Sequence, residues 1–324
     1  MKVLIADKFE QIGHDGLASL GCEVLNQPEV AADALAEALK NAGPTVLIVR
    51  SKKVNKAAIE AGAAAGLKAI IRAGAGFDNI DCAAAAARGV AVCNCPGMNA
   101  VAVAELTMGL LICLDRRIPD QTAELRGGHW KKKDFSVAKG LKGQTLGVIG
   151  MGAIGREVVR RAQAFGMKVI AHSLNMSRDR AHDLHIEDGG STRAELLAML
   201  PRCDAVTIHV AANPESDRMC NTEFFAAMKP GAYFINTSRG SVVDEPALLD
   251  AMKSKKIRVG LDVFENEPAE GACDWTTQVA SLPGTVVTHH VGASTDQAQT
   301  AVADEVVRIV RVFKGAGRWE NKVN

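Results

Sequence analysis

Aromatic residues are scarce in this chain of 324 residues: they make up 4% of the sequence, with a single tyrosine. Proteins that bind single-stranded nucleic acid without sequence preference stack bases on aromatic side chains, so this scarcity argues against that class. Net charge is also nearly absent, because 38 Lys and Arg face 37 Asp and Glu, which gives +1. The sequence therefore predicts no nucleic-acid partner and no membrane-surface partner.

Long apolar runs and a leader-like pattern are lacking too. The longest nearly apolar stretch, residues 100–114, is shorter than the roughly 20 residues that cross a bilayer, and it contains Glu105. The first residues read as a strand that begins at once, not as a basic segment before an apolar one. The eight cysteines form no C-x-x-C pair, so we expect reduced thiols, no metal site and a cytoplasmic protein.

What the chain has instead is a regular alternation of β-branched runs and helical patterns. Examples of predicted strands are residues 2–6, 45–49, 145–150, 205–209, 232–236 and 285–289, with helical patterns at 31–40, 153–164 and 244–253. This alternation is typical of parallel sheets with helices on both faces. The length allows about two domains. The predicted fold class is therefore α/β, with two doubly wound parallel-sheet domains.

The division between these domains is predicted near Pro96-Gly97. A long helical pattern from Asn99 to about Arg116 opens the second sheet system, and the last helical pattern, residues 294–313, can return to the first. We therefore predict a discontinuous domain of residues 1–97 plus 290–324, and a second domain of residues 98–289.

A glycine-rich turn follows the predicted strand at 145–150. Gly150, Gly152 and Gly155 have the spacing G-x-G-x-x-G, after an apolar strand and at the start of a helix. The first glycine permits the turn, the second lets the backbone approach a pyrophosphate, and the third allows strand and helix to pack closely. The helix N-terminus favours the anion. A glycine-rich turn without a ligand is the alternative, and the context favours dinucleotide binding.

The next predicted strand, residues 168–172, ends where such domains place an acid that binds the ribose hydroxyls of the adenosine. Here the position holds Ser173, and no acid follows until Asp179. Serine does not repel a 2′-phosphate, and Arg178 and Arg180 are near enough in sequence to reach one, unless both are simply solvated. We therefore expect NAD as the cofactor, with NADP as the alternative.

Polar groups follow three further predicted strands. They are Arg239 in NTSRG, the acids Asp262, Glu265 and Glu267 in LDVFENEP, and the pair His289 and His290 in VVTHHVG. Ligands bind beyond the carboxyl ends of parallel strands, so we expect these groups to converge. An arginine that binds a carboxylate, a histidine that exchanges a proton and a carboxylate that orients it suit proton-coupled chemistry on an anionic substrate. Neighbouring strand residues point to opposite faces, so the two histidines cannot share one role.

These motifs resemble those of the D-2-hydroxyacid dehydrogenase family over nearly the whole chain. The matching segments are the loop at 150–155, NTSRG at 236–240, LDVFENEP at 261–268 and HVGAST at 290–295. Within the family, the chain is most similar to the 3-phosphoglycerate dehydrogenases, through VRSKKV at 49–54, RAGAGFDNID at 72–81, LRGGHW at 125–130 and GASTDQAQ at 292–299. The resemblance implies a Rossmann cofactor domain at 98–289, a flavodoxin-like substrate domain at 1–97 plus 290–324, and a homodimer.

The resemblance also implies roles for individual residues. The catalytic residues are Arg239, Glu267 and His290, of which His290 carries the proton. His289 occupies a position that usually holds proline, and we expect it to pack or to make a backbone contact. The cofactor-binding residues are Gly150, Gly152, Ala153, Ile154, Gly155, Ser173, His209, Thr237, Ser238, Asp262 and Gly292. Of these, Asp262 holds the nicotinamide carboxamide. The substrate-binding residues are Arg50 and Lys52 for a phosphate, Gly74, Ala75 and Gly76 for a carboxylate, and Asn99.

The implied function is the oxidation of 3-phosphoglycerate to 3-phosphohydroxypyruvate by hydride transfer to NAD, the first step of serine biosynthesis, in a short form without a C-terminal regulatory domain. An NADPH-linked hydroxypyruvate or glyoxylate reductase, or another D-2-hydroxyacid dehydrogenase, is the alternative that Ser173 favours. A catalytically inactive co-repressor on the same fold is an alternative of another class, against which the complete catalytic set argues. Lys131–Lys133 read as a solvated loop or as a segment that reaches a neighbouring subunit.

Overall fold

The computed structural model describes residues 1–268 and 272–324, and the chain divides into two compact units. Unit 1 comprises Met1–Asn99 and Ser294–Asn324, and unit 2 comprises Ala100–Ala293. The boundaries lie at 99/100 and 293/294, compared with 97/98 and 289/290 in the prediction from the sequence. His290 therefore belongs to unit 2. The N–H groups of Val291 and Gly292, which follow it, donate hydrogen bonds to Asp262 of the same unit.

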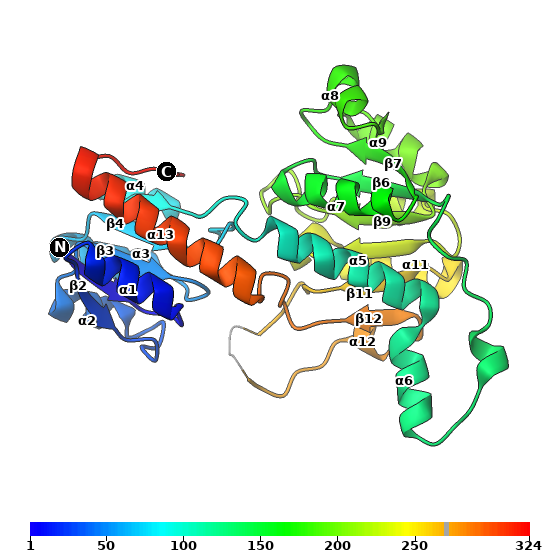
Figure 1. Cartoon of the computed structure of the whole chain (residues 1–324), viewed down its shortest axis with the longest axis horizontal. Coiled ribbons are helices and arrows are strands. Elements are labelled where there is room, and N and C mark those ends of the chain that lie inside the picture. Colours follow the sequence, from blue (N-terminus) through cyan, green and yellow to red (C-terminus); the bar gives the residue numbers. More distant parts are fainter. Residues whose placement is uncertain (269–271) are drawn as a thin grey trace. The chain divides into compact units, whose positions relative to one another are not determined.

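Unit 1 contains a five-stranded parallel sheet with the order β2-β1-β3-β4-β5, which is that of flavodoxin-like sheets. Its strands are β1 (Lys2–Ile5), β2 (Glu23–Asn26), β3 (Val46–Val49), β4 (Ala69–Arg72) and β5 (Ala91–Cys93). Its helices are α1 (Gln11–Ser19), α2 (Leu35–Ala42), α3 (Lys56–Ala64), α4 (Cys82–Ala87) and α13 (Asp296–Ala316). Helices α1 and α13 lie side by side on one face, and α2 to α4 cover the other (Figure 1). Every residue of the central strand β3 is buried, as expected of a parallel strand covered on both faces.

Unit 2 contains a seven-stranded parallel sheet with the order β12-β11-β10-β9-β6-β7-β8. Its strands are β6 (Thr145–Ile149), β7 (Lys168–His172), β8 (Glu187–Asp188), β9 (Ala205–Ile208), β10 (Tyr233–Asn236), β11 (Arg258–Leu261) and β12 (Thr285–Val287). Numbered from its own first strand, the sheet has the Rossmann order with one added edge strand. Two parallel, doubly wound sheets therefore confirm the predicted fold class.

Helices cover both faces of the sheet of unit 2. The helices of this unit are α5 (Ala100–Arg116), α6 (Ile118–Arg126), α7 (Ala153–Ala164), α8 (Arg178–Asp183), α9 (Arg193–Met199), α10 (Thr222–Ala227), α11 (Glu245–Lys255) and α12 (Gln278–Ser281), with 3-10 turns η1 (Lys132–Phe135), η2 (Leu200–Arg202) and η3 (Gly240–Val242). Helix α6 and η1 contain no buried residue and do not take part in this cover. Helices α5 and α7 pack together on one face, and the core on the other face includes residues of α9 to α12 (Figure 1). Among the helices of residues 1–268 and 272–324, none is both long and apolar enough to cross a membrane.

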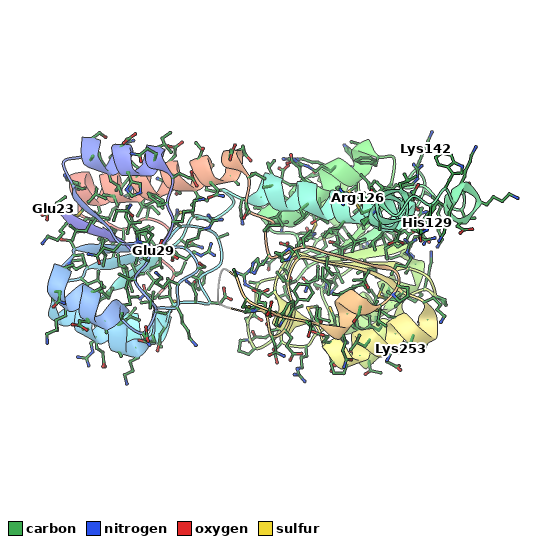
Figure 2. The ribbon with its side chains drawn as sticks, turned by 90° about the horizontal axis from the view of Figure 1, so that it is seen from below. Glu23, Glu29, Arg126, His129, Lys142 and Lys253 are labelled. Carbon is green, nitrogen blue, oxygen red and sulfur yellow. The ribbon has the colours of Figure 1, made fainter. Side chains whose placement is uncertain are left out.

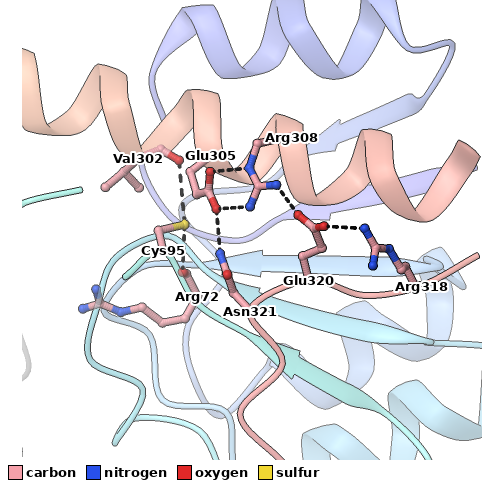
Figure 3. A network of polar contacts seen from close by, with 8 residues as sticks. All are labelled: Arg72, Cys95, Val302, Glu305, Arg308, Arg318, Glu320 and Asn321. Atoms are coloured by element: carbon pink, nitrogen blue, oxygen red, sulfur yellow. Dashed lines mark hydrogen bonds and ion pairs between the residues drawn. The ribbon is translucent and has the colours of Figure 1, made fainter. Parts of the chain in front are cut away.

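The last residues of the chain return to the β5 edge of unit 1. Lys322 forms an antiparallel bridge with Cys93, and the Val323 N–H donates to the Val92 carbonyl at 2.8 Å. Figure 3 shows how the side chains hold this segment: the Arg308 guanidinium on α13 pairs with Glu305 and with Glu320. The segment thereby covers an edge strand that would otherwise offer its backbone groups to another chain.

Candidate functional site

Five strands of unit 2 end along one edge of its sheet. In the register of the sheet, Ile149 pairs with His172 and Ile208, and Asn236 pairs with Ile208 and Leu261. The residues that follow these strand ends are Gly150, Ser173, His209, Thr237 and Asp262. Neighbouring strands lie about 4.8 Å apart, so these five predicted site residues form one row. The strand order reverses between β6 and β9, which is where open α/β sheets bind their ligands.

The glycine-rich turn after β6 combines two packed glycines with one that faces open space. Gly150 has φ +97°, and a Cβ added there would lie 2.5 Å from the His209 carbonyl oxygen. A Cβ on Gly155 would lie 2.0 Å from the Gly150 carbonyl oxygen. A Cβ on Gly152 would meet nothing within 4 Å, and Gly152 caps α7 without a side-chain hydrogen bond. The first turn of α7 therefore has backbone N–H groups and free space, as anion binding requires.

His209 lies beside this turn as a neutral imidazole. Its Nε2 atom is 3.0 Å from the Thr207 hydroxyl oxygen, and its Nδ1 atom is buried without a hydrogen-bond partner. Burial lowers the pKa of His209 to about 3, so the ring is uncharged near neutral pH. A buried ring nitrogen without a partner is costly, and a ligand that supplies a hydrogen bond would relieve that cost.

An arginine lies next to the predicted ribose-binding position. The Arg180 guanidinium donates to the Met151 carbonyl at 3.5 Å and to the Asn175 carbonyl at 3.2 Å. It therefore lies between the glycine-rich turn and the loop that begins at Ser173. Arg178, the other predicted candidate, is exposed.

Arg239 stands on a turn organised by a residue that sequence reasoning missed. Asn236, with 0% of its surface exposed, accepts the Ser238 N–H at 2.9 Å and the Ser238 hydroxyl at 2.7 Å. Its amide also donates to the Arg239 carbonyl at 2.8 Å. The asparagine thus fixes the backbone on both sides of the guanidinium-bearing residue. Its position at the end of β10, inside NTSRG, is the feature of the sequence from which this role could have been predicted.

Helix α5 supplies a second missed residue. The buried Thr107 hydroxyl donates to the Val103 carbonyl at 2.8 Å, and it lies 3.0 Å from the Thr237 hydroxyl. Because the Thr107 proton goes to Val103, Thr237 donates to Thr107. Thr237 is one of the predicted cofactor-binding residues, and α5 therefore orients it.

The two glutamates of LDVFENEP have different partners. Glu265 pairs with Arg218 at 2.5 Å, and this hydrogen bond raises the pKa of Arg218. The Glu267 Oε1 atom lies 2.5 Å from Nδ1 of His290, and its Oε2 atom accepts the Phe264 N–H at 3.3 Å. The structure therefore brings together Glu267 and His290, as predicted, and gives Glu265 a different partner.

Both histidines lie beyond β12, although the predicted strand, residues 285–289, included His289. Strand β12 ends at Val287, and His290 has a left-handed backbone with φ +52°. The expectation that His289 and His290 alternate across a strand is therefore wrong, because the chain turns before it reaches them. A left-handed residue other than glycine costs roughly 1–2 kcal/mol. That cost identifies His290 as a residue that its surroundings hold in place.

In unit 1, the two predicted phosphate-binding side chains have different partners. The Arg50 guanidinium donates to the Gln299 side-chain oxygen at 2.6 Å and to the Ser294 hydroxyl at 3.4 Å. The Lys52 ammonium donates to the carbonyls of Pro28, at 3.0 Å, and Val30. Arg50 thus lies among polar side chains, whereas Lys52 ties down a backbone segment.

Asp7 positions this basic loop, and sequence reasoning missed it. Its carboxylate accepts the backbone N–H groups of Arg50 at 2.7 Å, Lys52 at 3.0 Å and Ser51 at 3.2 Å. Asp7 follows β1, which pairs with β3, so the aspartate lies next to the loop that leaves β3.

The loop from Gly74 to Gly76 is held by residues that follow β5. The Asn94 amide donates to the Ala75 carbonyl at 2.6 Å, and the Cys95 N–H donates to the Gly74 carbonyl at 2.9 Å. The Asn99 side-chain oxygen is buried without a hydrogen-bond partner, as suits a residue that binds a ligand. Within the described ranges, no group of three or more His, Cys, Asp or Glu side chains is arranged to hold a metal ion.

Comparisons with known proteins show what this chain is similar to. Residues 108–292 match the family model described as D-isomer specific 2-hydroxyacid dehydrogenase, NAD binding domain. The chain is 38% identical over 317 residues to a D-3-phosphoglycerate dehydrogenase from Methanocaldococcus jannaschii, which covers 96% of this chain and 58% of that relative. It is 42% identical over 274 residues to a hydroxypyruvate reductase from Thermotoga maritima, which covers 84% of this chain and 85% of that relative. A solved glyoxylate reductase from Paecilomyes thermophila has a TM-score of 0.86 at 28% identity, over 100% of this chain and 98% of that one. The chain spans little more than half the length of the phosphoglycerate dehydrogenase.

Proposed function

Because this chain belongs to the D-isomer-specific 2-hydroxyacid dehydrogenase family, we propose that it oxidises a D-2-hydroxy acid, with 3-phosphoglycerate as the substrate. The product is 3-phosphohydroxypyruvate, and the reaction is the first step of serine biosynthesis. The observation that carries the proposal is the 2.5 Å contact between Nδ1 of His290 and Oε1 of Glu267. It pairs a proton carrier with the carboxylate that orients it, as general acid–base catalysis on a hydroxy acid needs.

In the proposed reaction, His290 removes the proton of the substrate hydroxyl through Nε2, since Nδ1 faces Glu267. Glu267 accepts the hydrogen bond from Nδ1–H, which fixes the tautomer and stabilises the imidazolium that forms. Arg239 binds the substrate carboxylate and the carbonyl oxygen that develops at C2. The hydroxyl proton therefore goes to His290, and the hydrogen on C2 leaves with its electron pair as hydride.

The proposed cofactor is NAD, which when bound supplies the acceptor for that hydride. The residues fit such a group: Gly152 leaves the space that a Cβ would fill, and His209 has a buried nitrogen without a partner. Gly150 to Gly155, including Ala153 and Ile154, would hold the pyrophosphate at the N-terminus of α7. The remaining residues of the proposed cofactor site are Ser173, Thr237, Ser238, Asp262 and Gly292.

The proposed substrate contacts lie in unit 1. Arg50 is the residue that we assign to the phosphate, because its guanidinium lies among the side chains of Ser294 and Gln299. Lys52 is a weaker candidate, since its ammonium is engaged by two carbonyls. Gly74 to Gly76 and Asn99 remain proposed contacts for the rest of the substrate.

A second candidate function is an NADPH-linked hydroxypyruvate or glyoxylate reductase. The specific observation in its favour is Arg180, which lies against the Met151 carbonyl beside a position that holds Ser173 and no acid. A guanidinium there suits a 2′-phosphate. The relative with 42% identity is named a hydroxypyruvate reductase.

We also propose a homodimer in the cytoplasm. Helix α6 and the segment that follows it, residues 118–140, form an arm in which no residue is buried. The arm exposes 57% of Leu125, 79% of Trp130 and 76% of Val137, and it carries Arg126 and His129, labelled in Figure 2. A short helix that buries no residue is only marginally stable alone, so a second copy of the chain is the proposed partner, with Lys131–Lys133 beside the contact.

The cytoplasmic location is proposed from the cysteines. All eight lie in described ranges and are unpaired, which fits a reducing compartment.

The deciding experiment is a panel of steady-state rates with 3-phosphoglycerate, glycerate and D-lactate, each with NAD and NADP, and with hydroxypyruvate and glyoxylate in reverse. A preference for 3-phosphoglycerate with NAD supports the first proposal. A preference for hydroxypyruvate or glyoxylate with NADPH supports the second. No turnover of any substrate would overturn both and leave a catalytically inactive co-repressor. Sedimentation of the wild type and of Trp130→Asp tests the dimer, which the substitution should weaken.

A further inference from the structure

The carboxylate of the buried Asp262 accepts hydrogen bonds from a single loop, residues 288–292. Asp262 follows β11 with 1% of its surface exposed. Its Oδ1 atom accepts the Thr288 hydroxyl at 2.6 Å and the Val291 N–H at 2.9 Å, and its Oδ2 atom accepts the Gly292 N–H at 2.8 Å. These three donors lie on both sides of His290 in the sequence.

His290 is the strained residue of this loop, with its φ of +52°. Such a conformation persists only when the surrounding structure over-determines it. The hydrogen bonds to Asp262 hold His290 in this conformation, because they fix the chain at Thr288 before it and at Val291 and Gly292 after it. Gly292 permits the close approach, since a Cβ there would lie 3.0 Å from Oδ2 of Asp262.

The capacity of the carboxylate limits what else it can do. An ionised carboxylate has about four acceptor sites, and the loop fills three. The nicotinamide carboxamide that the family resemblance assigns to Asp262 can therefore use one site at most.

We propose that Asp262 is a positioning residue for the reaction: it clamps residues 288–292 and so holds the imidazole of His290 against Glu267. The catalytic consequence rests on the proposed dehydrogenase function. The clamp itself is a property of the fold and can be tested without turnover.

Thr288→Val is the sharpest variant, because it keeps the shape of the side chain, removes one bond of the clamp and leaves Asp262 itself in place. We expect kcat to fall about tenfold, with KM and the dinucleotide Kd within about twofold of the wild type. Thr288→Ser, which keeps the hydroxyl, should restore kcat. Thr285→Val is the matched control on β12: its hydroxyl donates to the Val279 carbonyl at 3.0 Å, away from Asp262, and its kcat should be unchanged.

Amide hydrogen exchange at Val291 and Gly292 supplies the readout that needs no activity. Both amides should be protected in the wild type and should exchange at least about tenfold faster in Thr288→Val and in Asp262→Asn. If the wild type turns over no hydroxy acid, the proposed function fails while the exchange rates still decide the clamp. Unchanged exchange and unchanged kcat in Thr288→Val would overturn the clamp. So would a weaker dinucleotide Kd with unchanged kcat and exchange, since Asp262 would then act through the cofactor alone.

Discussion

A Cβ atom on Gly240 would lie 1.9 Å from the carbonyl oxygen of Phe264. The two residues follow different strands: Gly240 comes directly after Arg239 beyond β10, and Phe264 lies in the loop after β11 that carries Glu267. Their backbones are therefore in direct contact, and the absence of a side chain at Gly240 sets how closely the arginine turn approaches the glutamate loop.

Gly240→Ala should consequently damage stability and activity together. The added methyl must displace the backbone of Phe264 and Glu265, and overpacking of this kind costs about 1–3 kcal/mol of unfolding free energy. We expect kcat/KM to fall more than about tenfold, because Arg239 and Glu267 move apart. Urea unfolding and steady-state kinetics measure the two effects. Gly109→Ala is the matched control: a Cβ there meets nothing within 4 Å in α5, so activity should be kept.

His290 and Glu267 should behave as a unit. His290→Ala should lower kcat by about 10²–10⁴-fold with the dinucleotide Kd nearly intact, because the proton carrier is lost. Glu267→Gln should lower kcat by a smaller factor, and the double variant should be little worse than His290→Ala. His289→Ala, at the exposed neighbouring position, is the control and should keep its turnover. Additive losses in the double variant, or an active His290→Ala, would contradict the assignment.

The sequence predicts the parts of this molecule that are local along the chain. The glycine-rich turn, the NTSRG turn and the LDVFENEP loop each combine a strand end and its functional group within a few residues, so motif and context are read together. The central strands are equally readable because they are buried on both faces. The edge strands β2 and β8 are not among the predicted examples: β2 has only two apolar residues between exposed polar ones, and β8 consists of two acids, so neither forms a long apolar run.

Contacts between segments that are distant in the chain could not be predicted from the sequence. Asp7 binds the backbone of Arg50 across 43 residues, and Asp262 binds Gly292 across 30. Both pairings depend on which strands lie side by side in the sheet, and periodicity does not give strand order. Helix α6 was missed for another reason: none of its residues is buried, so it shows no helical pattern of apolar positions.

The buried His209 should make the protein less stable in mild acid. Burial lowers its pKa from the ordinary 6.5 to about 3, so the unfolded chain binds a proton in this interval that the folded chain does not. The unfolding free energy should therefore fall as pH drops below about 6.5, by up to about 1.4 kcal/mol per pH unit, and this contribution should be flat above 6.5.

Melting temperatures from pH 4 to pH 8 measure this effect. His209→Asn should show a shallower decline than the wild type, because the substitution removes one titrating group. Burial also lowers the pKa of His172, so part of the slope should remain in the variant. His182→Asn, at an exposed position on α8, is the control. Equal slopes for His209→Asn and the wild type would rule out His209 as the source.

Variants of Arg50 and Lys52 should have different effects, because we assign Arg50 to the substrate phosphate and Lys52 to the structure of a loop. Arg50→Ala should lower kcat/KM for 3-phosphoglycerate about 10–100-fold and leave D-lactate nearly unchanged, since a charged hydrogen bond contributes about 1.5–3 kcal/mol. Lys52→Met should weaken all substrates alike, because its ammonium holds the Pro28 and Val30 carbonyls and its loss loosens the loop. Lys53→Met, at the exposed next position, should match the wild type. If Arg50→Ala weakened 3-phosphoglycerate, glycerate and D-lactate equally, the phosphate assignment would be wrong, and Arg50 would instead serve the same loop as Lys52.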